Sequence, residues 1–119
     1  MINTFIKDIV IVTGGGRGIG LACVKELTSI GYNVFIIGLS EKLIEPIPET
    51  TYFSCNLADR NERNRVINLI SNIPDIKIKA LVNNAAISHN YSAIDYPNEK
   101  WDDIISLNLT AVIELSCAF

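Results

Sequence analysis

The chain has 119 residues, of which 49% are hydrophobic and 19% charged, and its formal net charge is −3. This length supports one domain, in which about two-thirds of the unfolded surface becomes buried. The slightly acidic balance, without a basic run, argues against nucleic acid as a partner. No apolar stretch reaches membrane-spanning length and the first residues lack a signal-peptide pattern, so we expect a cytoplasmic protein without membrane contact.

The chain starts with a short lead-in over residues 1–7, and one domain is expected over residues 8–119. Residues 9–12 are apolar and mostly β-branched, which predicts a buried parallel strand over residues 8–13. A glycine-rich turn follows, and the apolar rhythm after it predicts a helix over residues 18–30, closed by Gly31. The positions expected on the buried stripe of this helix are Ile19, Cys23, Leu27 and Ile30.

The turn between this strand and this helix has the composition of a phosphate-binding corner. Gly14, Gly18 and Gly20 have a G-x-x-x-G-x-G spacing. Bare backbone lets a pyrophosphate come close, and the free amides at a helix N-terminus face its negative charge. Apolar runs on both sides of the turn argue against a glycine-rich hairpin or linker. The sequence therefore predicts a dinucleotide site here.

The end of the second strand, expected over residues 33–37, indicates which dinucleotide is bound. An acidic residue at this place would bind the ribose 2′-hydroxyl of NAD, but the chain has Gly38. Arg17 could hold a 2′-phosphate with a forked pair of hydrogen bonds, and Ser40 could add a hydroxyl. We therefore expect NADP(H) in preference to NAD(H). Two alternatives stay open: Arg17 as a plain exposed loop residue, and Glu41 as a carboxylate near the ribose.

Little regular structure is expected over residues 41–50, and a third strand over residues 51–55 is followed by Asn56 and Leu57. The amide oxygen of Asn56 can accept a hydrogen bond from a bound molecule, and a plain turn asparagine is the alternative. Asp59 and Glu62 then have the spacing of a capping box, which is a better explanation than a catalytic carboxylate pair. The helix that they begin is expected to bury Val66, Leu69, Ile70 and Ile73 and to end before Pro74.

A fourth strand is expected over residues 80–84, and it leads into the sequence Asn83-Asn84-Ala85-Ala86. A helix is expected from Asn98 onward, with Asn108 among its apolar positions. The three cysteines, Cys23, Cys55 and Cys117, are widely separated and odd in number. Buried thiols explain them better than a disulfide or a metal site, and no metal is expected.

Thr-Gly-x-x-x-Gly-Ile-Gly, Asn-Asn-Ala-Ala and the Trp…Asn-Leu-Thr context of Asn108 together resemble the short-chain dehydrogenase/reductase family over nearly the whole chain. The resemblance implies an α/β fold: a Rossmann-like doubly wound parallel sheet, incomplete, with about four strands in the order 3-2-1-4. Ala86 stands where the family usually has glycine, which is strained only if its φ is positive. The cofactor-binding residues that it implies are Gly14, Gly16, Arg17, Gly18, Ile19, Gly20, Ser40, Asn56, Leu57, Asn84, Ala85 and Ala86.

The resemblance also implies an activity, namely hydride transfer between NADP(H) and a carbonyl or alcohol. Within the family, the sequence most resembles the 3-oxoacyl-carrier-protein reductases. Asn108 is the one catalytic residue implied, through a water in the proton relay, and the alternative is a buried, locally bonded asparagine. We expect the chain to be truncated before the family's catalytic Ser and Tyr-x-x-x-Lys, and therefore inactive alone, while its parent is a homo-oligomeric reductase.

Two other classes of function stay open. The chain could be a non-catalytic module that keeps the nucleotide-binding corner as a sensor or scaffold. It could also be an S-adenosylmethionine-dependent enzyme, which has a similar glycine turn, but Gly38 stands where that class would have an acid.

Overall fold

The computed structural model describes residues 5–119, so the first four residues of the expected lead-in lie outside the described residues. The elements run in the order β1 (Lys7–Thr13), α1 (Gly18–Ser29), β2 (Asn33–Gly38), β3 (Thr50–Ser54), α2 (Arg60–Ser71), β4 (Ile76–Val82), α3 (Asn98–Ile105), the π-helix η1 (Ser106–Thr110) and α4 (Ala111–Ala118). Within this part of the chain, none of the helices has the length and apolar character needed to cross a membrane.

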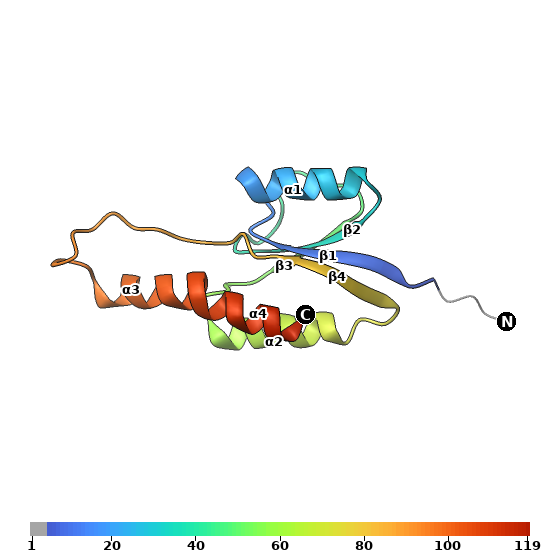
Figure 1. Cartoon of the computed structure of the whole chain (residues 1–119). Helices are drawn as coiled ribbons and strands as arrows, with labels where there is room; N and C mark the ends of the chain where they lie inside the picture. The colour runs from blue at the N-terminus through green and yellow to red at the C-terminus, as the bar shows by residue number, and fades with distance from the viewer. Residues whose placement is uncertain (1–4) are drawn as a thin grey trace.

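The four strands form one parallel sheet in the order β3-β2-β1-β4. Helix α1 covers one face of the sheet, and α2 and α4 cover the other (Figure 1). The connection from β4 to α3 projects beyond the sheet before the chain turns back through α3 (Figure 1). This arrangement confirms the doubly wound α/β fold and the strand order expected from the sequence.

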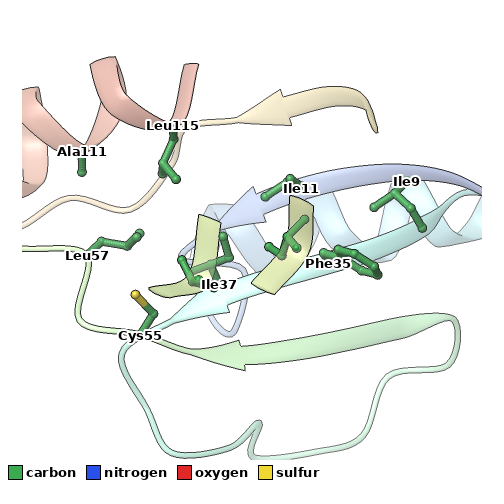
Figure 2. Packing of buried hydrophobic residues seen from close by; sticks show 10 residues of the cluster. Ile9, Ile11, Phe35, Ile37, Cys55, Leu57, Ala111 and Leu115 are labelled. Atoms are coloured by element: carbon green, nitrogen blue, oxygen red, sulfur yellow. The ribbon is translucent and has the colours of Figure 1, made fainter. Parts of the chain in front are cut away.

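Both faces of the central strands are buried, which explains why their sequences are continuously apolar. Alternate residues of β1 and β2 point to opposite sides. Ile9, Ile11, Phe35 and Ile37 pack toward α2 and α4, where they meet Leu57 and Leu115 (Figure 2). Val10, Val12, Val34 and Ile36 pack with Val24 toward α1.

The buried side of α1 differs from the predicted stripe. Ile19 and Ile30 are 78% and 62% exposed, and the residues that α1 buries are Gly20 and Val24. Gly20 sets this rotation because it packs directly against the backbone of Gly14. Gly31 follows the helix with φ 102°, as its expected role at the helix end requires.

Three other boundaries or faces also differ from the predictions. Leu69 is 49% exposed and Ile73 lies beyond the end of α2, which buries Val66, Ile70 and the charged Arg63. Strand β4 spans Ile76–Val82 and not residues 80–84, so it begins four residues earlier than predicted and the Asn-Asn sequence follows it. The buried face of α2 depends on the pairing of Arg63 with Glu114, and the bounds of β4 depend on its backbone pairing with β1. The spacing of apolar residues in the sequence indicates neither contact.

The cysteines do not form the uniformly buried set that was predicted. Cys55 is buried, Cys23 is half-buried and Cys117 is exposed. Residues 116–118 at the end of α4 are all exposed, so the apolar context of Cys117 in the sequence did not indicate burial.

Candidate functional site

The glycine turn brings an open helix N-terminus to the carboxyl end of β1. Gly14 and Gly18 have φ values of 65° and 57°, which side-chain-bearing residues rarely adopt. A Cβ on Gly20 would collide with the Gly14 carbonyl oxygen, so only glycine lets α1 pack this closely. No side chain caps the first turn of α1 and no acidic residue lies in it. Its free amides are therefore available to an anion.

Thr13 and Asn84 connect this turn to the chain after β4. The backbone amides of Asn84 and Ala85 donate to Thr13 Oγ1, at 3.0 and 2.9 Å. Asn84 Nδ2 donates to the carbonyl oxygens of Thr13 and Gly14, at 3.1 and 3.2 Å. Sequence reasoning did not assign Thr13 a role, although a polar residue between a buried strand and a glycine turn could have indicated one. The four hydrogen bonds hold both motifs at one edge of the sheet.

A cavity of about 550 Å³ opens at this edge. Most residues predicted to contact a cofactor line it: Gly14, Gly16, Arg17, Gly18, Ile19, Ser40, Asn56, Leu57, Asn84, Ala85 and Ala86. Gly20 instead lies buried behind the turn. The only side-chain-bearing residues with positive φ in the described chain are Glu49 and Asp75, so Ala86 replaces the expected glycine without strain. The structure thus gathers residues from four separate segments around one space.

The wall beyond β2 contains two residues that the sequence did not single out. Lys42 lines the cavity, as do Arg17 and Ser40, and Tyr52 lines it from β3. The Tyr52 hydroxyl donates to the carbonyl oxygen of Ser40 at 2.7 Å. Arg17 and Lys42 are the charged residues of the cavity lining, so the lining is cationic and suits a phosphate group.

The loop after β3 is held by hydrogen bonds within itself and to α2. Asn56 Oδ1 accepts from the Ala58 amide at 3.1 Å, which is the asparagine turn left open above. Asp59 caps α2 by accepting from the Glu62 amide at 3.0 Å. The capping box is incomplete, because the Glu62 carboxylate accepts from the Asn56 amide and not from that of Asp59. These contacts fix Asn56 and its neighbour Leu57 at the cavity wall.

Asn108 does not line the cavity but positions a residue that does. It lies in the middle of η1, and a π-helical turn of this kind often occurs at functional sites. Its Oδ1 accepts from the Ile87 amide at 2.9 Å and its Nδ2 donates to the Ile87 carbonyl at 2.8 Å. The sequence predicted an uninterrupted helix, so the π-helical turn was missed. The two bonds make Asn108 a positioning residue for the chain that follows Asn84.

One Tyr-x-x-x-Lys spacing does occur, at Tyr96 and Lys100, although the motif was expected only beyond this chain. Tyr96 precedes α3 and packs between the rings of Tyr91 and Trp101, with centroid distances of 5.2 and 5.8 Å. Neither Tyr96 nor Lys100 lines the cavity. This match is therefore not placed to act on a molecule bound there.

A family model described as short chain dehydrogenase matches residues 8–119. The chain belongs to this family of oxidoreductases. The chain is 37% identical over 118 residues to a 3-oxoacyl-[acyl-carrier-protein] reductase of Haemophilus influenzae, covering 92% of the chain and 47% of the reductase. It is 30% identical over 114 residues to a tropinone reductase homolog of Arabidopsis thaliana, covering 89% and 44%. The chain spans less than half the length of these curated relatives.

Solved structures confirm the fold of the chain. A metagenomic short-chain oxidoreductase in complex with NADP superposes with a TM-score of 0.86 at 23% identity, over 96% of this chain and 55% of that one. A 4-hydroxyisoleucine dehydrogenase complexed with NADH superposes with a TM-score of 0.84 at 17% identity, over 93% and 47%. The two structures hold different dinucleotides, so similarity of fold does not indicate which dinucleotide this chain prefers. That preference has to be argued from the residues of this chain.

Proposed function

We propose that residues 8–119 form the N-terminal, NADP(H)-binding part of a carbonyl reductase. The observation that carries this proposal is the uncapped N-terminus of α1, which opens through the glycine turn onto the cavity beside Arg17. The family match and the short span of the chain relative to its relatives support it.

The residues around the cavity fit the parts of a dinucleotide. The amides of Gly18 and Ile19 would hold the pyrophosphate at the start of α1. Asn56 and Leu57 would flank the adenine, and the segment from Asn84 to Ala86 would line the riboses. A Cβ built on Gly18 meets nothing within 4 Å, so the backbone there is open to a ligand.

Arg17 and Ser40 would bind the 2′-phosphate of NADP(H). Arg17 is exposed at the cavity mouth, and Gly38 contributes no carboxylate that would repel a phosphate. A charge-assisted hydrogen bond contributes about 1.5–3 kcal/mol, which corresponds to roughly tenfold or more in affinity. When bound, NADPH supplies the hydride for carbonyl reduction.

The proposed substrate is a 3-oxoacyl thioester or a similar ketone, which the similarity to 3-oxoacyl-[acyl-carrier-protein] reductases supports. Reduction also needs an acid that protonates the forming alkoxide. Tyr96 and Lys100, which have the Tyr-x-x-x-Lys spacing, do not line the cavity, and the Tyr52 hydroxyl that does line it is already bonded to the Ser40 carbonyl. We therefore propose that the 119-residue chain binds the dinucleotide but does not turn over substrate.

We also propose that the longer protein is a homo-oligomer. Apolar side chains recur every four residues along α3, η1 and α4 and stay 38–54% exposed. These residues are Trp101, Ile105, Leu109 and Ile113. Such a stripe is typical of a helix face that pairs with another surface. The free thiols of the described chain support a cytoplasmic location as part of the same proposal.

Isothermal titration of the chain with NADPH and NADH tests the binding proposal. We expect tighter binding of NADPH, and Arg17→Ala should weaken NADPH binding while leaving NADH nearly unchanged. Gly18→Asp should abolish binding of both, because it places a carboxylate at the pyrophosphate amides. Equal affinities for NADPH and NADH would contradict the cofactor preference. Steady NADPH oxidation with an acetoacetyl thioester would contradict the inactivity of this chain.

A further inference from the structure

The carboxyl end of β2 is covered by a side chain from the neighbouring strand. Tyr52 pairs with Ile36 in the β2–β3 ladder, and Gly38 lies two residues further along β2. Ile36 and Gly38 therefore face the same side of the sheet, toward α1. The phenol of Tyr52 packs on this side, in the cluster that contains Ile36.

The side chain of Tyr52 fills the space next to the Cα atom of Gly38. A Cβ on Gly38 would lie 2.6 Å from the Tyr52 hydroxyl oxygen and 3.1 and 3.2 Å from Cε2 and Cζ of its ring. These separations are too short for any side chain at position 38 while Tyr52 keeps this conformation. The φ of Gly38 is not positive, so the glycine is required by this close approach and not by its backbone geometry.

Tyr52 is held in this conformation at both ends. Its ring packs in the cluster with Leu43 and Ile47. Its hydroxyl donates to the Ser40 carbonyl at 2.7 Å, which ties the segment after β2 to β3. Burial raises the pKa of Tyr52 above its ordinary value, so the group beside the cavity stays neutral.

We propose that Tyr52 determines the preference of the site for a 2′-phosphate over a free ribose hydroxyl. Its phenol fills the place at Gly38 where a carboxylate would bind the ribose. Its hydrogen bond to the Ser40 carbonyl holds the segment after β2 where Ser40 can contact the phosphate. An acid at the end of β2 would bind a free ribose hydroxyl and repel a 2′-phosphate. With Tyr52 in this position, Ser40 and Lys42 line the same cavity as Arg17. This inference rests on the proposed NADP(H) site and assigns its selectivity to a residue pair, Gly38 and Tyr52.

The first test measures binding of adenosine 2′,5′-bisphosphate and of 5′-AMP to the 119-residue chain by isothermal titration. The readout is the ratio of the two dissociation constants. A variant that only loses stability weakens binding of both nucleotides alike, so this ratio stays the same. Tyr52→Phe keeps the ring and removes the bond to Ser40, so the preference for the bisphosphate should fall about three- to tenfold. Tyr32→Phe, in the same cluster but away from the cavity, should leave the ratio unchanged.

The second test exchanges the pair. Gly38→Asp alone should lower the melting temperature because the new side chain collides with the phenol. Gly38→Asp combined with Tyr52→Ala should be less destabilised than the two single losses together, and should favour 5′-AMP. If Gly38→Asp alone does not fold, the double variant still tests nucleotide preference, because Tyr52→Ala removes the collision.

The outcomes separate the inference from the proposed function. If the wild-type chain binds both nucleotides equally, the NADP(H) preference fails and the inference fails with it. If the wild type prefers the bisphosphate, but neither Tyr52→Phe nor the double variant changes the ratio, the inference alone is wrong. A reduced ratio in Tyr52→Phe, a reversed one in the double variant and an unchanged one in Tyr32→Phe would support it.

Discussion

Arg63 and Glu114 are 51 positions apart in the chain, yet Arg63 Nε donates to Glu114 Oε2 at 2.8 Å. Arg63 is fully buried in α2 and also donates to the carbonyl oxygen of Leu57 at 2.8 Å. Because Leu57 lines the cavity, this pair connects the packing of α2 and α4 to the cavity wall. A buried guanidinium needs such partners, since desolvation of an unpaired charge is costly.

The pair predicts an acid-sensitive contribution to stability. The hydrogen bond from Arg63 holds the pKa of Glu114 below its ordinary value, and the charges of Arg63 and Arg60 act in the same direction. The stabilisation is therefore complete above the unfolded pKa of about 4.3, and is lost as the pH falls through the lowered value. Urea unfolding should show that Glu114→Gln loses less stability than wild type between about pH 6 and pH 3.

Glu45→Gln, in the exposed connection before β3, is the matched control for this measurement. It should lose the same stability as wild type over that pH range. If Glu114→Gln and wild type have parallel profiles, the ion pair does not contribute as stated.

Cysteine labelling should distinguish Cys55 from Cys117. Burial raises the pKa of the Cys55 thiol to about 11, with the nearby Glu62 carboxylate acting in the same direction. Because the thiolate is the reactive form, Cys55 should resist Ellman's reagent at about pH 8 until the protein unfolds. The exposed Cys117 should react fast. Cys117→Ser should remove the fast phase and Cys55→Ala should retain it, and the reverse result would place the reactive thiol at Cys55.

Thr13→Val should destabilise the chain by about 2–4 kcal/mol. The valine keeps the shape but leaves the amides of Asn84 and Ala85 without their shared acceptor, and each buried donor without a partner costs about 1–3 kcal/mol. NADPH binding should weaken as well, because the glycine turn loses its tie to the chain after β4. Thr51→Val, exposed on β3, is the control and should be near neutral in urea unfolding. An equally stable Thr13→Val variant would refute the role of this contact.

Asn108→Ala should release Ile87. The variant loses the acceptor of the Ile87 amide, so hydrogen exchange at that amide should speed up about tenfold. Asn61→Ala, on the exposed side of α2, should leave the exchange unchanged. In a longer protein with a catalytic Ser and Tyr-x-x-x-Lys, Asn108→Ala should lower kcat more than it changes NADPH affinity. Unaltered exchange at Ile87 would show that the side chain does not hold this segment.

Strand and turn positions in this chain follow from local chemistry. Continuous apolar runs identified β1 and β2, because a parallel strand is buried on both faces. The glycine turn before α1 was predicted because its backbone geometry needs residues without a Cβ, and the φ values of Gly14 and Gly18 agree. The strand order came from the family resemblance and is confirmed by the sheet.

Contacts between distant segments could not be read in the same way. The buried face of α1 is set by Gly20 against the Gly14 backbone, and the buried Arg63 is compensated by Glu114, on another helix. Tyr52 covers Gly38 only because β3 lies beside β2 in this register. The sequence by itself determined which segments become strands, helices and a glycine turn, since these depend on neighbours along the chain. Only the tertiary structure decided which side chains meet around the cavity, because burial and hydrogen bonding there join residues that local patterns do not relate.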